Sequence, residues 1–364
     1  GYMARAAFVM DRFMRWIGLP GKSFIPMMVG FGCTVPAIMG TRTLESKKDR
    51  YMTMFMSPFM SCGARLPVYA LFAAAFFPAF AGGVVFSLYL AGIVLAVITG
   101  LLLKRTLFKG EVSHFIMELP PYHKPRVGHI LRTAWTRLRM FVVRAGITIT
   151  IVVTILAGLN SFGVDGSFGK EDTEDSVLSA IGKTITPAFG PMGIEQENWP
   201  ATVGLFTGLF AKEAVVGTLN SLYAMDQPDE AAAEGDEGGF DFWGGIGESF
   251  ATIPENLAGV GGGLTDPLGV GMVGQTEEAL VEELETDSAV FTRMRARFSS
   301  IGAYVYLLFV LIYFPCVAAL GAAVREMGQF FGWLLAGYLT VLAWALSTLV
   351  YQLATGPQIL PVII

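Results

Sequence analysis

The sequence is poor in charged residues. Only 15% of its 364 residues are Asp, Glu, Lys or Arg, whereas soluble domains contain about 25%. At the same time 53% of the residues are hydrophobic, and several apolar runs are long enough to cross a bilayer. This composition excludes a soluble globular protein. It predicts an all-α polytopic membrane protein whose main partner is the lipid bilayer.

The sequence also lacks the motifs of several function classes. It contains no G-x-x-x-x-G-K-[ST] phosphate loop, so we expect this chain by itself neither to bind nor to hydrolyse a nucleotide. Its apolar runs hold no pair of Asp residues and no Ser–His combination, so we expect no enzyme activity. Nothing in the chain points to a nucleic-acid partner. The three cysteines lie in apolar surroundings, which argues against a secreted disulfide framework.

The three histidines lie in one basic segment, as His114, His123 and His129. No two of them have the H-x₃₋₅-H spacing typical of a zinc site, so a metal site there is disfavoured. The neighbouring run ELPPYHKP is better interpreted as a rigid proline turn.

The hydropathy pattern predicts about six spans, together with broken or re-entrant helices. Gly1–Leu19 is amphipathic and is expected to lie at the membrane interface. Phe24–Gly40 is apolar but interrupted by Gly and Pro and too short to span, so we expect a re-entrant helix. The expected spans are Tyr51–Phe77 (with a break at Ser57–Pro67), Val84–Leu103, Met140–Leu159, Pro200–Tyr223, Ile301–Leu320 and Phe330–Leu353.

These segments divide the chain into five regions. The chain begins GYMARAAF without an initiator Met, and we expect it to be a piece of a longer protein cut at its N-terminus. We also expect a short helix near Glu277–Leu284 within an otherwise mobile loop. The regions are 1–80 (broken helices), 81–160 (two spans joined by a basic loop), 161–224 (an outer loop and a second broken helix), 225–297 (an acidic mobile cytoplasmic loop) and 298–364 (the C-terminal spans).

The distribution of Lys and Arg predicts an orientation. Three segments near span ends are basic and are expected in the cytoplasm: Thr41–Arg50, Lys104–Arg139 and Arg293–Arg297. With alternating spans, Asn160–Trp199 is then expected outside and the C-terminus in the cytoplasm.

Each cysteine lies among residues that break helices. Cys33 stands between Gly32 and Pro36, Cys62 precedes Gly63, and Cys316 follows a proline in YFPCVAAL. A break frees backbone carbonyls, which a bilayer tolerates only against protein or a wet cavity. A lone membrane cysteine is usually a small hydrophobic residue. The shared context instead favours a path for a soft or borderline divalent cation, because thiolates bind Fe, Zn and Cu(I) better than Mg or Ca.

Two further residues are candidate ligands. Glu213 lies in the middle of the apolar segment Pro200–Tyr223, where an ionisable group costs about 2.5–3.5 kcal/mol and is therefore a functional candidate. The alternative is that Lys212 and Glu213 form an interfacial pair. Among the methionines that crowd this region, most are interpreted as packing, and Met60 in PFMSC is the best candidate for a thioether ligand.

A weak internal repeat supports a transporter. PAIMGT (Pro36–Thr41) resembles EAVVGT (Glu213–Thr218), so that Pro36 aligns with Glu213. Two interrupted helices at corresponding positions of two halves indicate a substrate site between them.

Long strings of the sequence resemble one known family. GFGCTVPAIMGTRTL, PFMSCGARLPVYALFAAAFF, MELPPYHKP, NWPATVGLFTGLFAKEAVVGTL and YFPCVAAL resemble, in order, the membrane region of FeoB-type ferrous-iron transporters. The resemblance runs from about residue 2 to the last span. It implies two Gate segments, a Cys-lined path that carries over onto Cys33, Cys62 and Cys316, and Fe²⁺ import across the bacterial inner membrane.

The resemblance also implies a GTP- and Mg²⁺-binding domain at the N-terminus of the full protein, which this sequence does not contain. Small accessory proteins and a homo-oligomer are further expected partners. Three alternatives stay open: transport of Zn²⁺ or Mn²⁺, transport of a nucleoside-like solute, and a redox-sensing membrane module.

Overall fold

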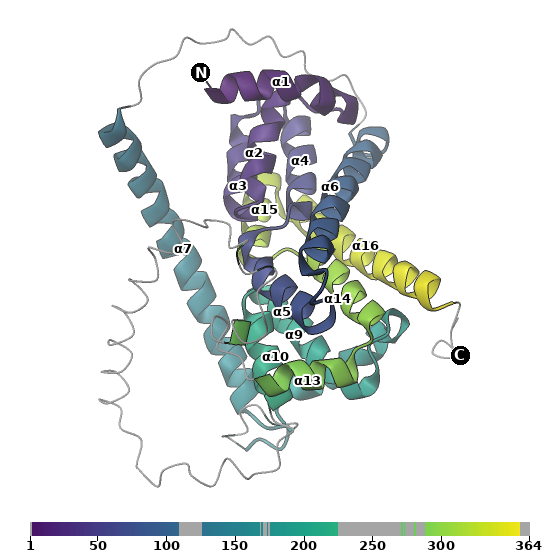
Figure 1. Ribbon diagram of the computed structural model, residues 1–364. Helices are drawn as coiled ribbons and strands as arrows, with labels where there is room; N and C mark the ends of the chain where they lie inside the picture. The colour runs from purple at the N-terminus through teal and green to yellow at the C-terminus, as the bar shows by residue number, and fades with distance from the viewer. Residues whose placement is uncertain are drawn as a thin grey trace.

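The computed structural model describes residues 2–108, 126–167, 169, 173, 175–224, 271, 273, 280–281 and 288–356. Within these residues the fold is helical, and the one β-type contact is an isolated bridge between Gly163 and Ser176. Figure 1 shows two groups of helices beside one long helix. The expected all-α membrane fold is confirmed.

The first group contains α1 to α6. Helix α1 lies across one end of the molecule (Figure 1), as expected for an amphipathic interfacial segment. The elements are α1 (Tyr2–Ile17), η1 (Gly21–Ser23), α2 (Phe24–Gly30), α3 (Thr34–Gly40), η2 (Thr41–Thr43), α4 (Lys47–Met56), η3 (Ser57–Phe59), η4 (Gly63–Arg65), α5 (Leu66–Phe76) and α6 (Ala81–Arg105).

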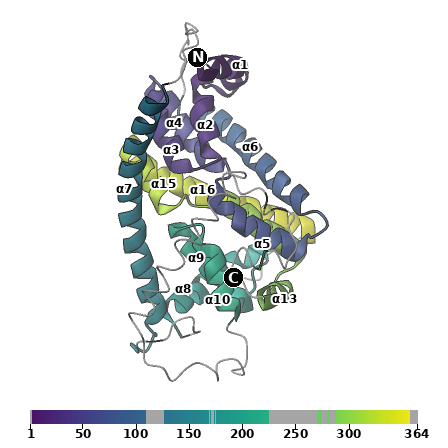
Figure 2. The same ribbon diagram turned by 60° about the vertical axis from the view of Figure 1, so that its left-hand side comes forward.

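The second group follows a single long helix, α7 (Val127–Ser161), which runs along one side of the molecule (Figure 2). Its elements are α8 (Val177–Ile185), η5 (Thr186–Met192), η6 (Gln196–Asn198), α9 (Trp199–Phe210), α10 (Ala214–Ala224), α13 (Ser288–Arg297), α14 (Ser300–Ile312), α15 (Val317–Met327) and α16 (Gln329–Thr355).

Each group contains a short helical hairpin. In the second, α9 and α10 are antiparallel, because a Cβ built on Gly204 would lie 3.2 Å from Leu219 and one built on Gly208 would lie 2.5 Å from Val215. The hydroxyls of Thr207 and Thr218 are also 3.0 Å apart across the pair. Small residues let the two backbones approach closely, as in other membrane helix pairs.

The first hairpin is built in the same way from α2 and α3. A Cβ on Gly40 would lie 3.8 Å from the Pro26 side chain, which places the end of α3 beside the start of α2. The tip of this hairpin is Phe31–Cys33, and the tip of the other is Ala211–Glu213. Aligned by these three-residue tips, Cys33 corresponds to Glu213. The repeat found in the sequence is therefore real in architecture but shifted by three residues from the PAIMGT–EAVVGT register.

The two groups have opposite orientations. The first hairpin enters from the end where α1 lies, and the second enters from the end where α13 lies (Figure 1). Each hairpin is followed by a broken span, α4–α5 or α14–α15, and then by an unbroken helix, α6 or α16. Inverted repeats that place broken helices at the centre are a common transporter architecture.

One of the six expected spans is wrong. Pro200–Tyr223 does not cross the membrane, because the Tyr223 hydroxyl at the end of α10 is 2.5 Å from the Asn198 side chain at the start of α9. The Arg297 guanidinium also donates to the Glu197 carbonyl at 2.8 Å. Glu197 and Arg297 therefore lie at the same end, although the sequence placed their segments, Asn160–Trp199 and Arg293–Arg297, on opposite sides of the membrane.

The end of α16 lies at that end as well, since the Gln352 side chain donates to the Pro191 carbonyl at 3.1 Å. The sequence placed the end of the last span and Pro191 on opposite sides of the membrane, and this separation is also wrong. Most of the predicted 225–297 loop, including most of the expected helix near Glu277–Leu284, lies outside the described residues.

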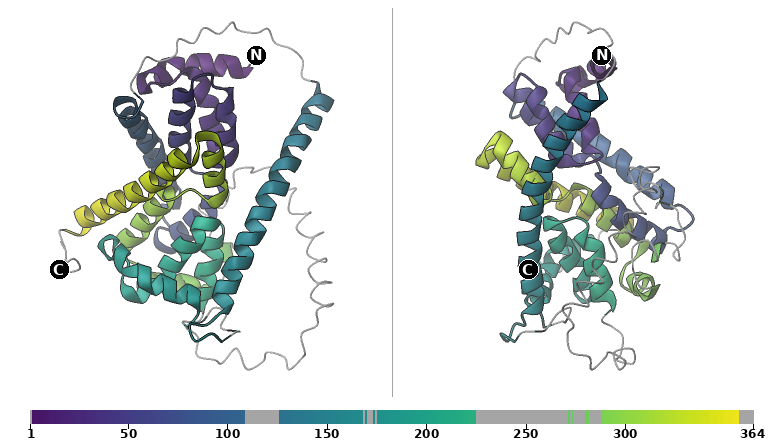
Figure 3. Two further views of the ribbon diagram at one scale, coloured as in Figure 1. Left: turned by 180° about the vertical axis from the view of Figure 1, so that it is seen from behind. Right: turned by 90° about the vertical axis from the view of Figure 1, so that its left-hand side faces the viewer.

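Burial separates the broken spans from the unbroken ones. Among the described residues, four helical stretches are long and apolar enough to cross a membrane: 47–76, 81–105, 300–327 and 329–355. The apolar windows of the two broken spans are 72% and 61% buried, against 33% for α6 and 28% for α16. The broken spans thus form the centre, and α6 and α16 face outward, as Figure 3 shows for α16. Of the six expected spans, the third, Met140–Leu159, falls within α7.

Candidate ion path at the broken helices

The three cysteines occupy equivalent positions. Cys33 precedes α3, Cys62 precedes η4, and Cys316 precedes α15, and each has an extended ψ between 133° and 158°. Each is therefore the residue at which the chain leaves one helix and enters the next. The prediction that all three lie at helix breaks is confirmed, and the reason is local: flanking Gly and Pro residues cannot continue the preceding helix.

The tertiary structure brings the breaks together. The Gly63 amide donates to the Gly32 carbonyl at 3.4 Å, which joins the first hairpin tip to the α4–α5 break. Cys33 also lies within electrostatic reach of Cys62, Cys316 and Glu213. The cysteines are free thiols and are half-buried. Three residues that are far apart in sequence therefore lie near Cys33.

Lys212 and Glu213, at the tip of the second hairpin, face different environments. Glu213 is exposed, whereas Lys212 is only 3% exposed and its Nζ donates to the Phe314 carbonyl at 3.0 Å. Within the described residues the two do not form an ion pair with each other, so the interpretation as an interfacial pair is not supported. The lysine instead joins the second hairpin to the α14–α15 break.

Met60 has a packing environment. Its side chain is 3% exposed, and a Cβ on Gly30 would lie 3.2 Å from the Met60 Cβ. The first hairpin is thus packed against Met60, which fills the space left by the glycine. Its proposed role as a thioether ligand stays a prediction.

Arg65 is a central residue that the sequence analysis missed. It is 2% exposed, and its Nη1 donates to the Pro58 carbonyl at 3.2 Å and to the Met60 carbonyl at 3.5 Å. It therefore satisfies carbonyls that the α4–α5 break sets free. The signal was present in the sequence, because an arginine within an apolar span meets the same criterion as Glu213.

The cysteines and Glu213 do not converge on one point. Within the described residues, no group of three or more His, Cys, Asp or Glu side chains is arranged to hold a metal ion. Of the histidines, His129 lies exposed on α7, and His114 and His123 fall outside the described residues. The arrangement suits an ion that meets its ligands one or two at a time.

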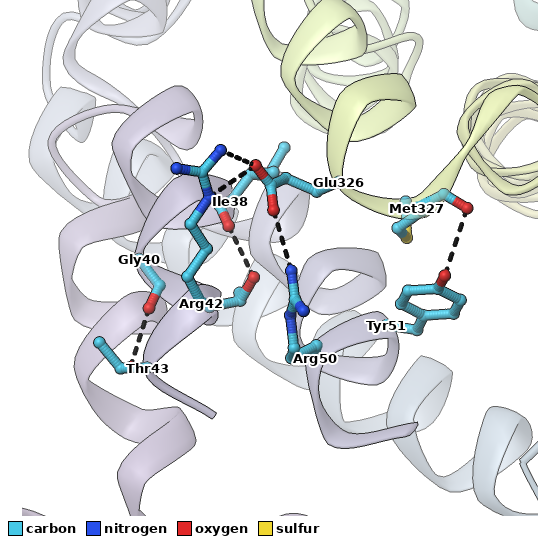
Figure 4. Close-up of polar contacts among 9 residues, drawn as sticks. Ile38, Gly40, Arg42, Thr43, Arg50, Tyr51, Glu326 and Met327 are labelled. Carbon is cyan, nitrogen blue, oxygen red and sulfur yellow. Dashed lines mark hydrogen bonds and ion pairs between the residues drawn. The ribbon is translucent and has the colours of Figure 1, made fainter. Parts of the chain in front are cut away.

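An ionic cluster joins the two halves at the α1 end (Figure 4). The Glu326 carboxylate at the end of α15 accepts from Arg42 at 2.8 and 2.5 Å and from Arg50 at 2.9 Å. The hydrogen bond to Glu326 raises the pKa of the Arg42 guanidinium. Beside it, the Tyr51 hydroxyl donates to the Met327 carbonyl at 3.3 Å. Helix α15, which follows Cys316, is thereby held against the first half.

Comparison with known families agrees with this architecture. The Gate family model, described as "Nucleoside recognition", matches residues 1–76 and 142–330. The model described as "Ferrous iron transport protein B C terminus" matches residues 85–137. The chain belongs to the Gate family. The two Gate matches fall on the two inverted groups of helices and leave out the last helix of each group, which is α6 in the first and nearly all of α16 in the second.

Curated FeoB-type relatives are similar over nearly the whole chain. A protein of Legionella pneumophila named Fe(2+) transporter FeoB is 51% identical over 355 residues, which cover 97% of this chain and 46% of that protein. Proteins of the same name from Salmonella paratyphi A and Salmonella typhimurium are 46% identical over 98% of this chain and 45% of their own length. The chain thus spans about half the length of these relatives. No solved structure matches it significantly.

Proposed function

We propose that this chain forms the Fe²⁺ path of a ferrous-iron transporter in a bacterial inner membrane. The observation that carries the proposal is the approach of the helix breaks to one another, with Cys62, Cys316 and Glu213 all within electrostatic reach of Cys33. Thiolate ligands favour Fe²⁺ over Mg²⁺ and Ca²⁺. An open arrangement suits transport, because an ion must be able to leave each site.

The broken spans support this function through their freed backbone carbonyls. A carbonyl without a helical partner offers an oxygen ligand inside the membrane. The two halves are inverted about these breaks, so a relative movement of the halves would open the region to one side or the other. Cys33 and Glu213, at equivalent hairpin tips, would then meet the ion from opposite sides.

The distribution of basic residues supports an orientation. The α1 end carries Arg42, Lys47, Lys48 and Arg50 in one segment and Lys104 and Arg105 at the end of α6. We therefore place the α1 end in the cytoplasm. The ends of α10 and α16 then lie on the outer side, which replaces the cytoplasmic C-terminus expected from the sequence.

The relatives are longer than this chain, and their additional part is the expected location of a regulatory domain. About half of their length lies outside the match to this chain. We expect that part to contain the GTP- and Mg²⁺-binding domain, which would bias the path between two states rather than ligate the ion. Accessory proteins and assembly into a homo-oligomer would likewise bias the path between its two states and would not ligate the ion.

Anaerobic Fe²⁺ binding to the purified chain tests the proposal. The variants are Cys33→Ser, Cys62→Ser, Cys316→Ser and Glu213→Gln, and Glu45→Gln serves as a control, because Glu45 is exposed at the α1 end. We expect weaker binding in at least two of the four variants and no change in the control. Mn²⁺ and Zn²⁺ are the competitors.

The outcome separates the alternatives. If all four variants bind Fe²⁺ as the wild type does, the cysteines are packing residues and the proposed path is wrong. If Zn²⁺ or Mn²⁺ displaces Fe²⁺ with higher affinity, the cargo is a different divalent ion. The redox alternative predicts a Cys33–Cys62 disulfide under oxidising conditions and no effect of Glu213→Gln.

A further inference from the structure

Two buried cations lie at the helix breaks, and the proposed path gives them no role. Arg65 is 2% exposed and Lys212 is 3% exposed. Within the described residues, no carboxylate lies at ion-pair distance from either side chain. A buried charge without a counter-ion is costly, so its retention calls for a functional explanation.

The two cations are held differently. Arg65 donates to two carbonyls, of Pro58 and Met60, that belong to its own break. Lys212 reaches from the second hairpin tip to another element, where its Nζ donates to the Phe314 carbonyl. The arginine is therefore fixed within one segment, whereas the lysine can withdraw with the hairpin that carries it.

The surroundings of the Lys212 Nζ are those of a cation site. It lies 3.2 Å from the centre of the Tyr313 ring, on the ring face, and 3.0 Å from the freed carbonyl of Phe314. Carbonyl oxygens and aromatic faces both attract cations. Cys316, two residues beyond Phe314, lies within electrostatic reach of the same lysine.

Comparison of the two halves isolates what the lysine adds. At the first hairpin tip, the equivalent position is Gly32, whose carbonyl accepts from the Gly63 amide of the neighbouring break. At the second tip, the equivalent contact to the neighbouring break is made by the Lys212 side chain. The second half thus places a positively charged side chain where the first half has a backbone contact.

We propose that Lys212 is a tethered cation that occupies the Phe314–Cys316 break when no metal ion is there, and that an arriving divalent cation displaces its Nζ. This inference rests on the proposed function. Its physical basis is competition: one freed carbonyl cannot serve an ammonium group and a metal ion together, and the two charges repel in a poorly solvated region. Lys212 therefore weakens metal binding at this break and helps the ion to leave.

Binding of Fe²⁺ under anaerobic conditions to the purified full chain tests the inference. Lys212→Gln removes the charge but keeps an N–H donor for the Phe314 carbonyl, and Lys212→Arg keeps the charge. We expect Lys212→Gln to bind Fe²⁺ about tenfold more tightly than the wild type or better. We expect Lys212→Arg to stay close to the wild type. Lys183→Met is the matched control, because Lys183 also lies over an aromatic ring, 4.9 Å from the centre of Trp199.

A second measurement uses the unaltered protein, so that it does not depend on the folding of a variant. An amine-reactive reagent and peptide mass spectrometry report the labelling of Lys212 with and without Fe²⁺. We expect labelling of Lys212 to rise when Fe²⁺ binds, because Nζ leaves its buried position, and labelling of Lys183 to stay constant.

The results separate the two proposals. If Fe²⁺ binding depends on the cysteines but Lys212→Gln binds no more tightly and Lys212 labelling does not rise, the tethered cation is wrong and the ion path stands. If the wild type binds no Fe²⁺, both proposals are overturned, because there is no ion for the lysine to oppose.

Discussion

The ionic cluster at the α1 end allows a quantitative prediction for Glu326→Gln. The Glu326 side chain is 6% exposed and holds two arginines, of which Arg42 is 61% exposed and Arg50 is 25% exposed. The substitution keeps the size of the side chain but removes its charge. It also turns an amide N–H₂ toward at least one arginine donor, which leaves that donor without an acceptor.

The magnitude follows from the exposure of each partner. A hydrogen bond to a charged group contributes about 1.5–3 kcal/mol, and the exposed Arg42 contributes little because water screens it. The half-buried Arg50 therefore dominates, and we expect Glu326→Gln to lower the free energy of unfolding by about 2–3 kcal/mol. The loss of stability caused by Glu326→Gln should be smaller when Arg50→Gln is already present, since the two side chains share one interaction.

Unfolding of the purified protein in mixed micelles by SDS, followed by tryptophan fluorescence, measures this change. Glu45→Gln is the control, because Glu45 forms a 3.2 Å ion pair with Lys22 but is 88% exposed. Exposed pairs contribute about 0–1 kcal/mol. If Glu326→Gln and Glu45→Gln shift the unfolding midpoint equally, the cluster does not hold α15 against the first half, and our reasoning is refuted.

Two further predictions concern packing and sidedness. Gly92→Ala should destabilise the fold by about 1–3 kcal/mol in the same assay, because a Cβ at this position of α6 would lie 2.5 Å from the Phe59 carbonyl at the α4–α5 break. The control is Gly337→Ala on α16, where a Cβ would meet nothing within 4 Å, and it should be neutral. Equal effects of the two substitutions would contradict the close approach of α6 to the break. On a background without native cysteines, the variants Glu195→Cys and Ala296→Cys should both react with a membrane-impermeant thiol reagent from one side of the membrane and Glu45→Cys from the other. Reaction of the first two from opposite sides would contradict the hairpin of α9 and α10.

The positions of the breaks could be predicted from the sequence because their causes are local. Pro315 before Cys316 and the glycines around Cys33 and Cys62 prevent a helix from continuing, whatever the rest of the chain does. The unbroken helices α6 and α16 were equally predictable, since their apolar runs are long enough to span. The candidate role of Glu213 also follows from its apolar neighbours alone.

The contacts of the charged residues were not predictable from the sequence. Lys212 bonds to Phe314 and Glu326 to Arg42, and these partners are separated by 102 and 284 residues, so no spacing rule connects them. The same holds for the approach of Glu213 to Cys33, which requires two hairpins to enter from opposite ends.

The sequence by itself determined that this is a membrane protein of broken helices, where those breaks lie, and which family it resembles, because composition and local backbone preferences decide these properties. Only the tertiary structure decided that Pro200–Tyr223 turns back rather than crosses. An apolar segment of 24 residues with a central break can form either a span or a hairpin, and the choice depends on the packing of Gly204 and Gly208 against the returning helix. That choice inverts the second half, reverses the sidedness of its loops, and brings Lys212 and Glu213 to the breaks in the middle of the molecule.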